Sequence, residues 1–299
     1  MANQMWMGIP GNHAQWVPCP LIDSSITRTR YAERMQFQNG GGDVQRSNQY
    51  QMEYNLSFNG PAHEADGIDA LNRFASGYYG DGYVYLAYPT HFKTNIFSAQ
   101  WATPALLGWS NSVYANGSIA ATSGTIAAGS NLSKTSMTFS ILGSTNSVPD
   151  ERFTILVPPG YTLILGATGS ATGTGVVRQR VRSITGTVTS TTSLTLIGVD
   201  STSGRYNSTV AGGSTGVTVE VYLSKTSSAV STVTLTALSA RLYETSKYSS
   251  TLLEDNVQVY GEGSTGLQFA DNAVVENYSY MYPPRKAVST TLVEVEAWR

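Results

Sequence analysis

The sequence predicts a mainly β protein, in which a β-rich domain with one short helix is interrupted by an inserted β-sandwich or jelly-roll module. Short runs of alternating apolar and polar residues recur along the chain, and Gly-, Ser- and Asn-rich turns separate them. One segment instead spaces its apolar residues as a helix does. Aromatic residues gather in the first and last parts, whereas Ser, Thr and Gly dominate the middle. Repeated short strands between turn signals are typical of a sandwich or barrel.

The first zone, residues 1–110, is predicted to hold a strand, the helix and a second strand. Residues 48–60 alternate polar residues with Tyr50, Met52, Tyr54, Leu56 and Phe58, which predicts a strand with one buried face. In "HEADGIDALNRFASGYYG" the apolar residues fall at helical spacing, and Gly77 can end the helix. "DGYVYLAYP" returns to the pattern of a strand.

The second zone, residues 111–245, is predicted to form the inserted module. Its strands are expected in "SMTFSILG", "ERFTILVPPGYTLILGATG", "SLTLIGVD", "GVTVEVYLSKT" and "STVTLTALSARLY". Residues 111–136 are weakly patterned and are interpreted as a linker or an edge strand.

The third zone, residues 246–299, is predicted to complete the domain that residues 1–110 begin, because the two ends of a domain often lie close together. "GSTGLQFADNAVVENYSYMYPP" predicts a strand pair joined by residues 270–272. "STTLVEVEAWR" predicts a final strand whose solvent face carries Glu294 and Glu296.

Composition excludes several classes of function. Charged residues make up 13% of the 299 residues, the formal net charge is −2, and no basic block occurs. Nucleic-acid recognition normally needs a concentrated basic patch, so it is not expected. No apolar run approaches the roughly 20 residues that cross a bilayer, so membrane insertion is not expected. The N-terminus lacks the pattern of a signal peptide and Cys19 is the one cysteine, which predicts synthesis in a cytoplasm.

The glycine-rich stretch "GATGSATGTGVVRQRVR" could be a phosphate-binding loop. A P-loop, however, needs a lysine and a following helix, and here a strand pattern follows without a lysine. We therefore interpret the stretch as a flexible turn between two strands.

Three arginines follow that turn on a strand. Arg178, Arg180 and Arg182 project from one face because side chains alternate along a strand. They form either a solvated face or an edge protected by like charges, or else a site for an anionic ligand or an acidic neighbouring subunit.

No constellation of catalytic residues is recognised, and no enzyme activity, cofactor or metal site is expected. His13, His63 and His91 lack the paired spacing of metal ligands. Cys19 has no neighbouring base, and we interpret it as a buried or incidental thiol. A glycoside hydrolase would need two facing carboxylates, for which the second zone offers chiefly Asp150, Glu151, Asp200 and Glu220.

A carbohydrate site is considered separately. Most aromatic residues of the second zone lie in apolar runs and are expected in the core. Tyr206, beside Arg205 and Asn207 in the turn-like "SGRYNST", is the aromatic residue free to meet a sugar. These three residues are the candidate glycan site.

The C-terminal stretch "VYGEGSTGLQFADNAVVENYSYMYPPRKAVSTTLVEVEAWR" resembles the ends of minor tail proteins from long-tailed phages of actinobacteria. "LVPPGYTLILGATGSATGTGVVRQR" looks like the middle sandwich of those proteins, and "ALNRFASGYYGDGYVYLAYP" is similar to their N-terminal part. The resemblance covers most of the chain, and its motifs are structural.

The resemblance implies a structural virion protein of the tail tip, comparable with distal tail proteins of siphophages. It implies a belt-like domain in residues 1–110 plus 246–299, and a galectin- or carbohydrate-module-like sandwich in residues 111–245. The expected partners are copies of itself in a ring (a hexamer or trimer), the tail tube protein and other tail-tip proteins. The alternative is a receptor-binding module for host attachment that engages cell-wall glycan through the sandwich.

Overall fold

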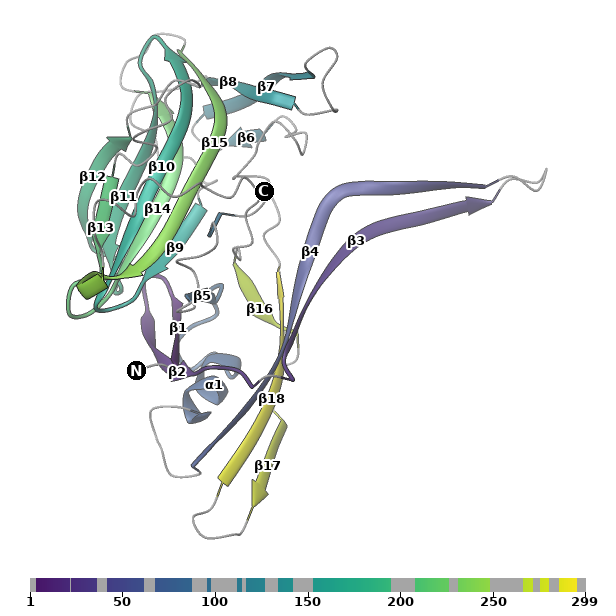
Figure 1. Cartoon of the computed structure of the whole chain (residues 1–299), viewed down its shortest axis with the longest axis vertical. Coiled ribbons are helices and arrows are strands. Elements are labelled where there is room, and N and C mark those ends of the chain that lie inside the picture. Colours follow the sequence, from purple (N-terminus) through teal and green to yellow (C-terminus); the bar gives the residue numbers. More distant parts are fainter. Residues whose placement is uncertain are drawn as a thin grey trace.

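The fold is that of a computed structural model, which confirms the prediction of a mainly β protein (Figure 1). The structure describes residues 4–21, 23–36, 42–61, 68–87, 96–97, 112–114, 117–126, 134–141, 153–194, 208–225, 231–247, 266–270, 275–279 and 285–294. Within these residues the strands form four antiparallel sheets.

One sheet joins the beginning of the chain to its end. Its order is β16 (Leu267–Phe269), β18 (Arg285–Glu294), β4 (Gly42–Pro61) and β3 (Ser25–Gln36), and β17 (Val275–Ser279) also pairs with β18. β4 alternates as predicted, with Tyr54, Leu56 and Phe58 buried. The predicted pairing of the two strands around residues 270–272 is wrong, because β16 and β17 lie one after the other along β18.

A three-stranded sheet lies beside the helix. Its order is β2 (His13–Pro18), β1 (Gln4–Ile9) and β5 (Tyr85–Ala87). The predicted helix is α1 (Ile68–Ala75), which buries Leu71 and Phe74 and is followed by Gly77 at φ +73°. Such a φ favours glycine and ends the helix. Buried side chains of α1, β1, β4 and β18 form one hydrophobic core.

The two remaining sheets are formed by strands from the middle of the chain. One has the order β13 (Ser208–Ala211), β10 (Tyr161–Thr172), β15 (Ser231–Glu244), β8 (Lys134–Ile141), β7 (Gly117–Ile126) and β6 (Ser112–Tyr114). The other has the order β12 (Val188–Leu194), β11 (Gly175–Ser183), β14 (Val217–Lys225) and β9 (Phe153–Val157). A short 3-10 helix, η2 (Thr245–Lys247), follows β15. A jelly-roll connection remains a prediction.

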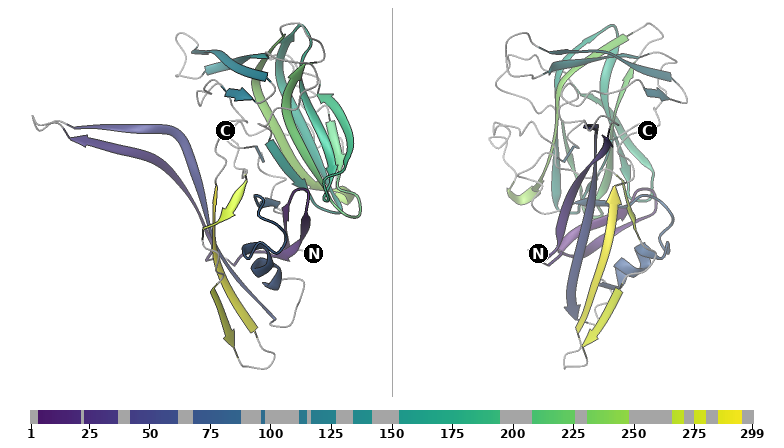
Figure 2. Two further views of the ribbon diagram at one scale, coloured as in Figure 1. Left: turned by 180° about the vertical axis from the view of Figure 1, so that it is seen from behind. Right: turned by 90° about the vertical axis from the view of Figure 1, so that its right-hand side faces the viewer.

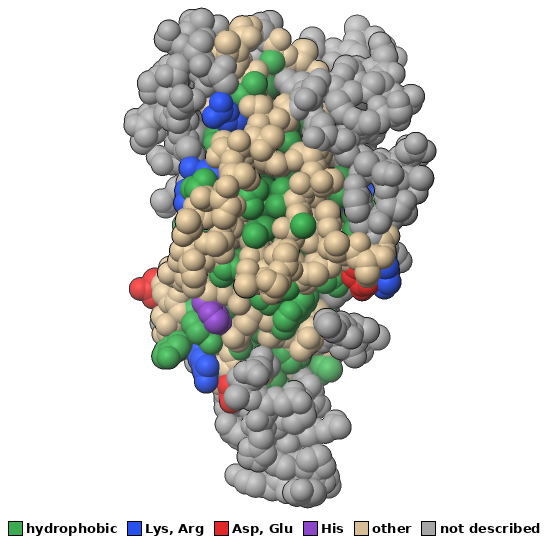
Figure 3. Space-filling view, turned by 90° about the vertical axis from the view of Figure 1, so that its left-hand side faces the viewer, with side chains coloured by type: hydrophobic (Ala, Val, Ile, Leu, Met, Phe, Trp, Pro, Cys, Tyr) green, Lys and Arg blue, Asp and Glu red, His purple; other side chains and the backbone are tan. Residues whose placement is uncertain are grey.

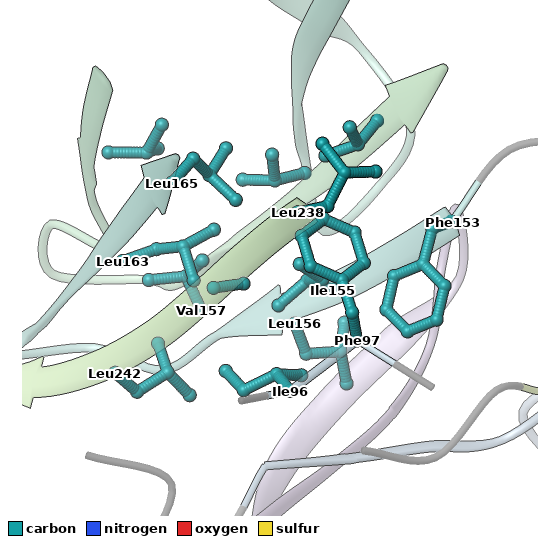
Figure 4. Close-up of a cluster of buried hydrophobic side chains, with 14 of the residues drawn as sticks. Ile96, Phe97, Phe153, Ile155, Leu156, Val157, Leu163, Leu165, Leu238 and Leu242 are labelled. Atoms are coloured by element: carbon teal, nitrogen blue, oxygen red, sulfur yellow. The ribbon is translucent and has the colours of Figure 1, made fainter. Parts of the chain in front are cut away.

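These two sheets share the second hydrophobic core, part of which Figure 4 shows. Leu163 and Leu165 of β10 and Leu238 of β15 lie in one buried cluster with Ile155 and Val157 of β9 (Figure 4). β10 and β15 contribute alternate residues, as expected of a β-sandwich, whereas β9 is buried along its whole length.

The three-stranded sheet contributes to both cores. Trp6 of β1 and Tyr85 of β5 pack with the sandwich. Met5 and Met7 of β1 and Leu86 of β5 pack instead with α1, β4 and β18. Alternate side chains of one sheet therefore connect the two parts of the molecule. The division at residues 110 and 246 stays a prediction.

The glycine-rich stretch holds a turn between two strands, as interpreted, but the turn is shorter than expected because residues 166–172 continue strand β10. β10 continues to Thr172 because it pairs with β15 up to Thr232, with a register shift at Thr168/Gly169. The turn is confined to residues 173–174, where Gly173 has φ +65°.

The β3–β4 hairpin extends far from the rest of the molecule (Figures 1 and 2). β4 pairs with β18 only from Glu53 to Pro61. Beyond that, residues 28–36 of β3 and 42–52 of β4 pair with each other in the described part of the chain. A register shift after Arg30 accompanies the bend of this ribbon, as irregular pairing commonly does. We call these residues the arm.

No helix among the described residues is long and apolar enough to cross a membrane.

Candidate functional site

The three predicted arginines lie on an inner strand. β11 has β12 on one side and β14 on the other, so the edge-strand explanation is wrong. Opposite β11, Tyr222 pairs with Arg178, Glu220 with Arg180 and Thr218 with Arg182. The arginines therefore share one sheet face with a carboxylate from the neighbouring strand.

Glu220 connects two of these arginines. Its Oε2 accepts a hydrogen bond from Nε of Arg180, and a second from Nε of Arg182 at 3.1 Å. Arg182 also donates from Nη1 to the carbonyl oxygen of Gly186 at 2.8 Å. These bonds hold the Arg182 guanidinium between strand β14 and the turn after β11.

Much of this polar cluster is buried, so the solvated-face interpretation is also wrong. Arg180 is 9% exposed and Glu220 is 5% exposed. Arg180 lies over the ring of Tyr222, 5.7 Å from its centroid, in a cation–π arrangement. Nε of Arg178, Nη2 of Arg180 and Oγ1 of Thr218 are buried and have no hydrogen-bond partner within the described part of the chain. Polar groups left in this way raise the free energy of the folded state.

A pocket opens beside the cluster, with a volume of about 400 Å³. It lies where the β1–β2 turn and the loop before β5 meet the outer face of the four-stranded sheet. Its described lining includes Gly11, Tyr83, Tyr85, Thr154, Arg182 and Glu220. The amide of Gly11 donates to the carbonyl oxygen of Ile184 at 2.9 Å and fixes one rim. The pocket thus combines two aromatic rings, a hydroxyl group and an arginine–carboxylate pair.

The predicted glycan site at Arg205, Tyr206 and Asn207 lies outside the described residues. So do His63, His91 and Glu296. His13 stacks on Tyr79 with ring centroids 4.0 Å apart. The described residues include no group of three His, Cys, Asp or Glu that could hold a metal ion.

Glu294 does not lie on a solvent face, as was predicted, but is buried at 5% exposure. It shares its side of β18 with Leu292, which belongs to the core beside α1. The alternation of side chains along the strand was predicted correctly, but the face that carries Glu294 is the buried face and not the solvent face.

Sequence reasoning missed the pocket and the role of Glu220 in it. The available signal was a single acidic residue in "VTVEVYLSK", on the same strand face as Thr218. The register between β11 and β14, and the approach of the β1–β2 turn, follow from tertiary packing and cannot be read from either strand.

Comparisons with known proteins add little. No protein-family model matches the chain, and no curated protein matches it. The "Structure of infectious bursal disease virus Gt strain" is 11% identical, with 97% of this chain and 73% of that chain covered, at a TM-score of 0.19. The T13 particle of the same virus is 12% identical, with 98% and 73% covered, at a TM-score of 0.22. Its VP2 subviral particle is 12% identical, with 98% and 76% covered, at a TM-score of 0.20. Similarity at these scores carries no argument about fold or function.

Proposed function

We propose that this chain is a structural protein of a virion, and that copies of it form a ring at the tail tip of a long-tailed phage. The ring would join the tail tube to components that contact the host. The placement at the tail tip rests on the resemblance of residues 259–299 to minor tail proteins. The self-assembly rests on the sheet that carries the arm.

The arm is the observation that carries the proposal. Over residues 28–36 and 42–52 it is a two-stranded ribbon, and no third described strand pairs with it. A two-stranded hairpin alone in water is marginally stable at best, and it gains stability when it packs against another surface. An arm that leaves its own molecule therefore favours a neighbouring subunit as that surface.

The sheet that carries the arm has two edges at which further strands can pair. Among the described strands, β3 forms one edge, and β16 and β17 form the other. Exposed strand edges are templates for pairing with another chain, and repeated head-to-tail contacts close into a ring when the rotation allows. The two edges differ, which fits a head-to-tail ring.

The surface is suited to repeated contacts. On the face shown in Figure 3, hydrophobic side chains (green) and uncharged polar side chains with the backbone (tan) predominate among the described residues, and charged side chains lie towards the margins. Burying hydroxyl and amide groups costs less free energy than burying charges. We propose no catalytic role, because glycoside hydrolysis uses two facing carboxylates and the described lining of the pocket has Glu220 alone.

Shortening the arm tests the assembly. Residues 31–49 would be replaced by Asn-Gly, which joins the paired residues Arg30 and Tyr50 through a two-residue hairpin turn. We expect the variant to keep its circular dichroism spectrum and thermal transition, and to elute as a monomer where the unmodified chain elutes as an oligomer. A variant that assembles as the unmodified chain does would contradict the role of the arm.

Immunogold labelling of virions that contain this chain tests the location. Label at the distal end of the tail is the expected result. Label on the capsid would reject the tail-tip assignment and keep the broader structural one.

A further inference from the structure

The pocket beside Arg182 lies outside the arm and the sheet that carries it, and its chemistry is that of a binding site. It takes residues from the β1–β2 turn, the loop before β5 and three strands of the sandwich. Its walls are held by the hydrogen bond from Gly11 to Ile184 and by the Arg182–Glu220 pair. A cavity with walls fixed from several elements is pre-organised for a ligand.

Charge indicates the sign of that ligand. Arg178, Arg180 and Arg182 share one sheet face with Glu220, which is the one acidic residue on that face among the described strands. Among the described residues of this face, three guanidinium groups thus stand against one carboxylate. Arg182 and Glu220 line the pocket, whereas Arg178 and Arg180 lie beside it on the same strand. This excess of positive charge favours an anionic ligand.

Arg182 is the arginine placed to bind it. Its side chain is 27% exposed and lines the pocket. Nε is engaged by Glu220 and Nη1 by Gly186, whereas Nη2 has no hydrogen-bond partner among the described residues. Arg182 therefore lines the pocket with a nitrogen that no described residue engages, and a charge-assisted N–H donor of this kind is suited to a carboxylate.

Size and lining indicate an organic ligand. A volume of about 400 Å³ falls within the range of ordinary ligand pockets, whereas one water molecule occupies about 30 Å³ of liquid. An inorganic ion would leave most of the space unfilled. Tyr83 offers apolar ring surface together with a polar end, Tyr85 adds ring surface, and Thr154 offers a hydroxyl group. This combination suits a ring that bears both hydroxyl groups and a charge.

We propose that the pocket binds one acidic sugar unit, a pyranose that carries a carboxylate. Arg182 binds the carboxylate, and Thr154 and the backbone groups of the rim bind ring hydroxyls. The proposal is independent of the protein ring, since no described residue of the pocket belongs to the arm or to the sheet that carries it.

Calorimetric titration of the full chain with sodium glucuronate, glucose and sodium phosphate tests the proposal. Glucuronate and glucose differ in the carboxylate, so we expect glucuronate to bind at least tenfold more tightly than glucose. We expect its affinity to fall as salt is raised, because salt screens the charges. Phosphate carries negative charge but has no sugar ring, and it should bind more weakly than glucuronate.

Variants identify the site. Arg182→Gln should weaken glucuronate binding at least tenfold, and Thr154→Val, which keeps the side-chain shape, should weaken it severalfold. Lys247→Gln removes a positive charge from an exposed residue outside the pocket and should leave binding unchanged. Thr154→Val keeps the test valid if the arginine variant fails to fold.

Three results would overturn the proposal. The first is equal affinity for glucose and glucuronate, and the second is equal loss of binding in Lys247→Gln and Arg182→Gln. The third is binding of an acidic peptide while galacturonate and glucuronate fail to bind, which would make the pocket a contact for a neighbouring protein. The state of assembly, read from the mass of the same samples, decides the ring separately.

Discussion

At the residue scale, the Glu220 carboxylate is held between two guanidinium groups on a buried sheet face. It accepts hydrogen bonds from Nε of both Arg180 and Arg182. Removing one partner of a buried ion pair costs more than removing an exposed one, because the remaining charge stays away from water. The stability of the four-stranded sheet therefore depends on this side chain.

Glu220→Gln should destabilise the chain by about 3–5 kcal/mol, since Arg180 then keeps its charge in a buried site without an anion. Unfolding by urea measures the change. Glu244→Gln is the matched control, because Glu244 pairs with Lys247 at the surface and surface pairs contribute little. Equal effects of the two substitutions would show that burial of the pair does not matter.

The thiol of Cys19 is a second residue whose surroundings change its chemistry. Burial raises its pKa above the ordinary value, because the thiolate is less well solvated than in water. The contribution of this thiol to stability is therefore present below its ordinary pKa, and it is lost as the pH rises through the raised one.

Iodoacetamide should consequently alkylate Cys19 more slowly in the folded chain than in the urea-unfolded chain at the same alkaline pH, since the thiolate is the nucleophile. Mass spectrometry at timed intervals follows the reaction. Equal rates in the two states would mean that folding does not lower the reactivity of the thiol.

At the scale of elements, the turn between β9 and β10 packs against the connection from β13 to β14. The amide of Gly212 donates to the carbonyl oxygen of Tyr161 at 2.8 Å, and that of Gly160 donates to the carbonyl oxygen of Gly213 at 3.1 Å. A Cβ at Gly212 would lie 2.0 Å from the carbonyl oxygen of Pro158. The close approach of these two backbones requires glycine at residue 212.

Gly212→Ala should lower the thermal midpoint far more than Gly213→Ala. The Gly213 position has space around a Cβ, and its φ of +62° costs a side chain only about 1–2 kcal/mol. Thermal unfolding of both variants, side by side, measures the difference. Similar midpoints would contradict the backbone contact between the two connections.

Sequence patterns located most strands because alternation reflects burial of one face. "GVTVEVYLSKT" and "STVTLTALSARLY" became β14 and β15, and the helical spacing became α1. Pairing was less predictable. β16 and β17 look like a hairpin in the sequence, yet both pair with β18, because partners across a sheet are chosen by tertiary packing.

The candidate site was predictable only in part. Alternation placed Arg178, Arg180 and Arg182 on one face. The sequence could not show that this face is covered, or that the β1–β2 turn meets it far along the chain. A polar sheet face is buried only when another part of the chain packs on it, and the sequence of the strand itself does not show which part does so.

At the scale of the whole molecule, the three-stranded sheet is shared by the sandwich and the core beside α1. Trp6 and Tyr85 pack on one side, and Met5, Met7 and Leu86 on the other. Because both cores include side chains of this sheet, unfolding of one core removes part of the other. We expect calorimetry of the chain to show one cooperative unfolding transition, whereas two well-separated transitions would mean that the cores are independent.

The arm gives the molecule its extended shape (Figure 2). The sheet that carries the arm has an edge on each side to which no further described strand pairs. Both features are explained if neighbouring copies pack on the arm and pair with the open edges. Association would then be a property of the folded chain itself, with the same faces used at every contact in the ring.

The mass of the purified, unmodified chain in solution, measured by light scattering over a range of concentrations, tests this account most directly. We predict a single species with a mass several times the 32.0 kDa of one chain, consistent with a closed ring. A particle of 32.0 kDa at every concentration would contradict it.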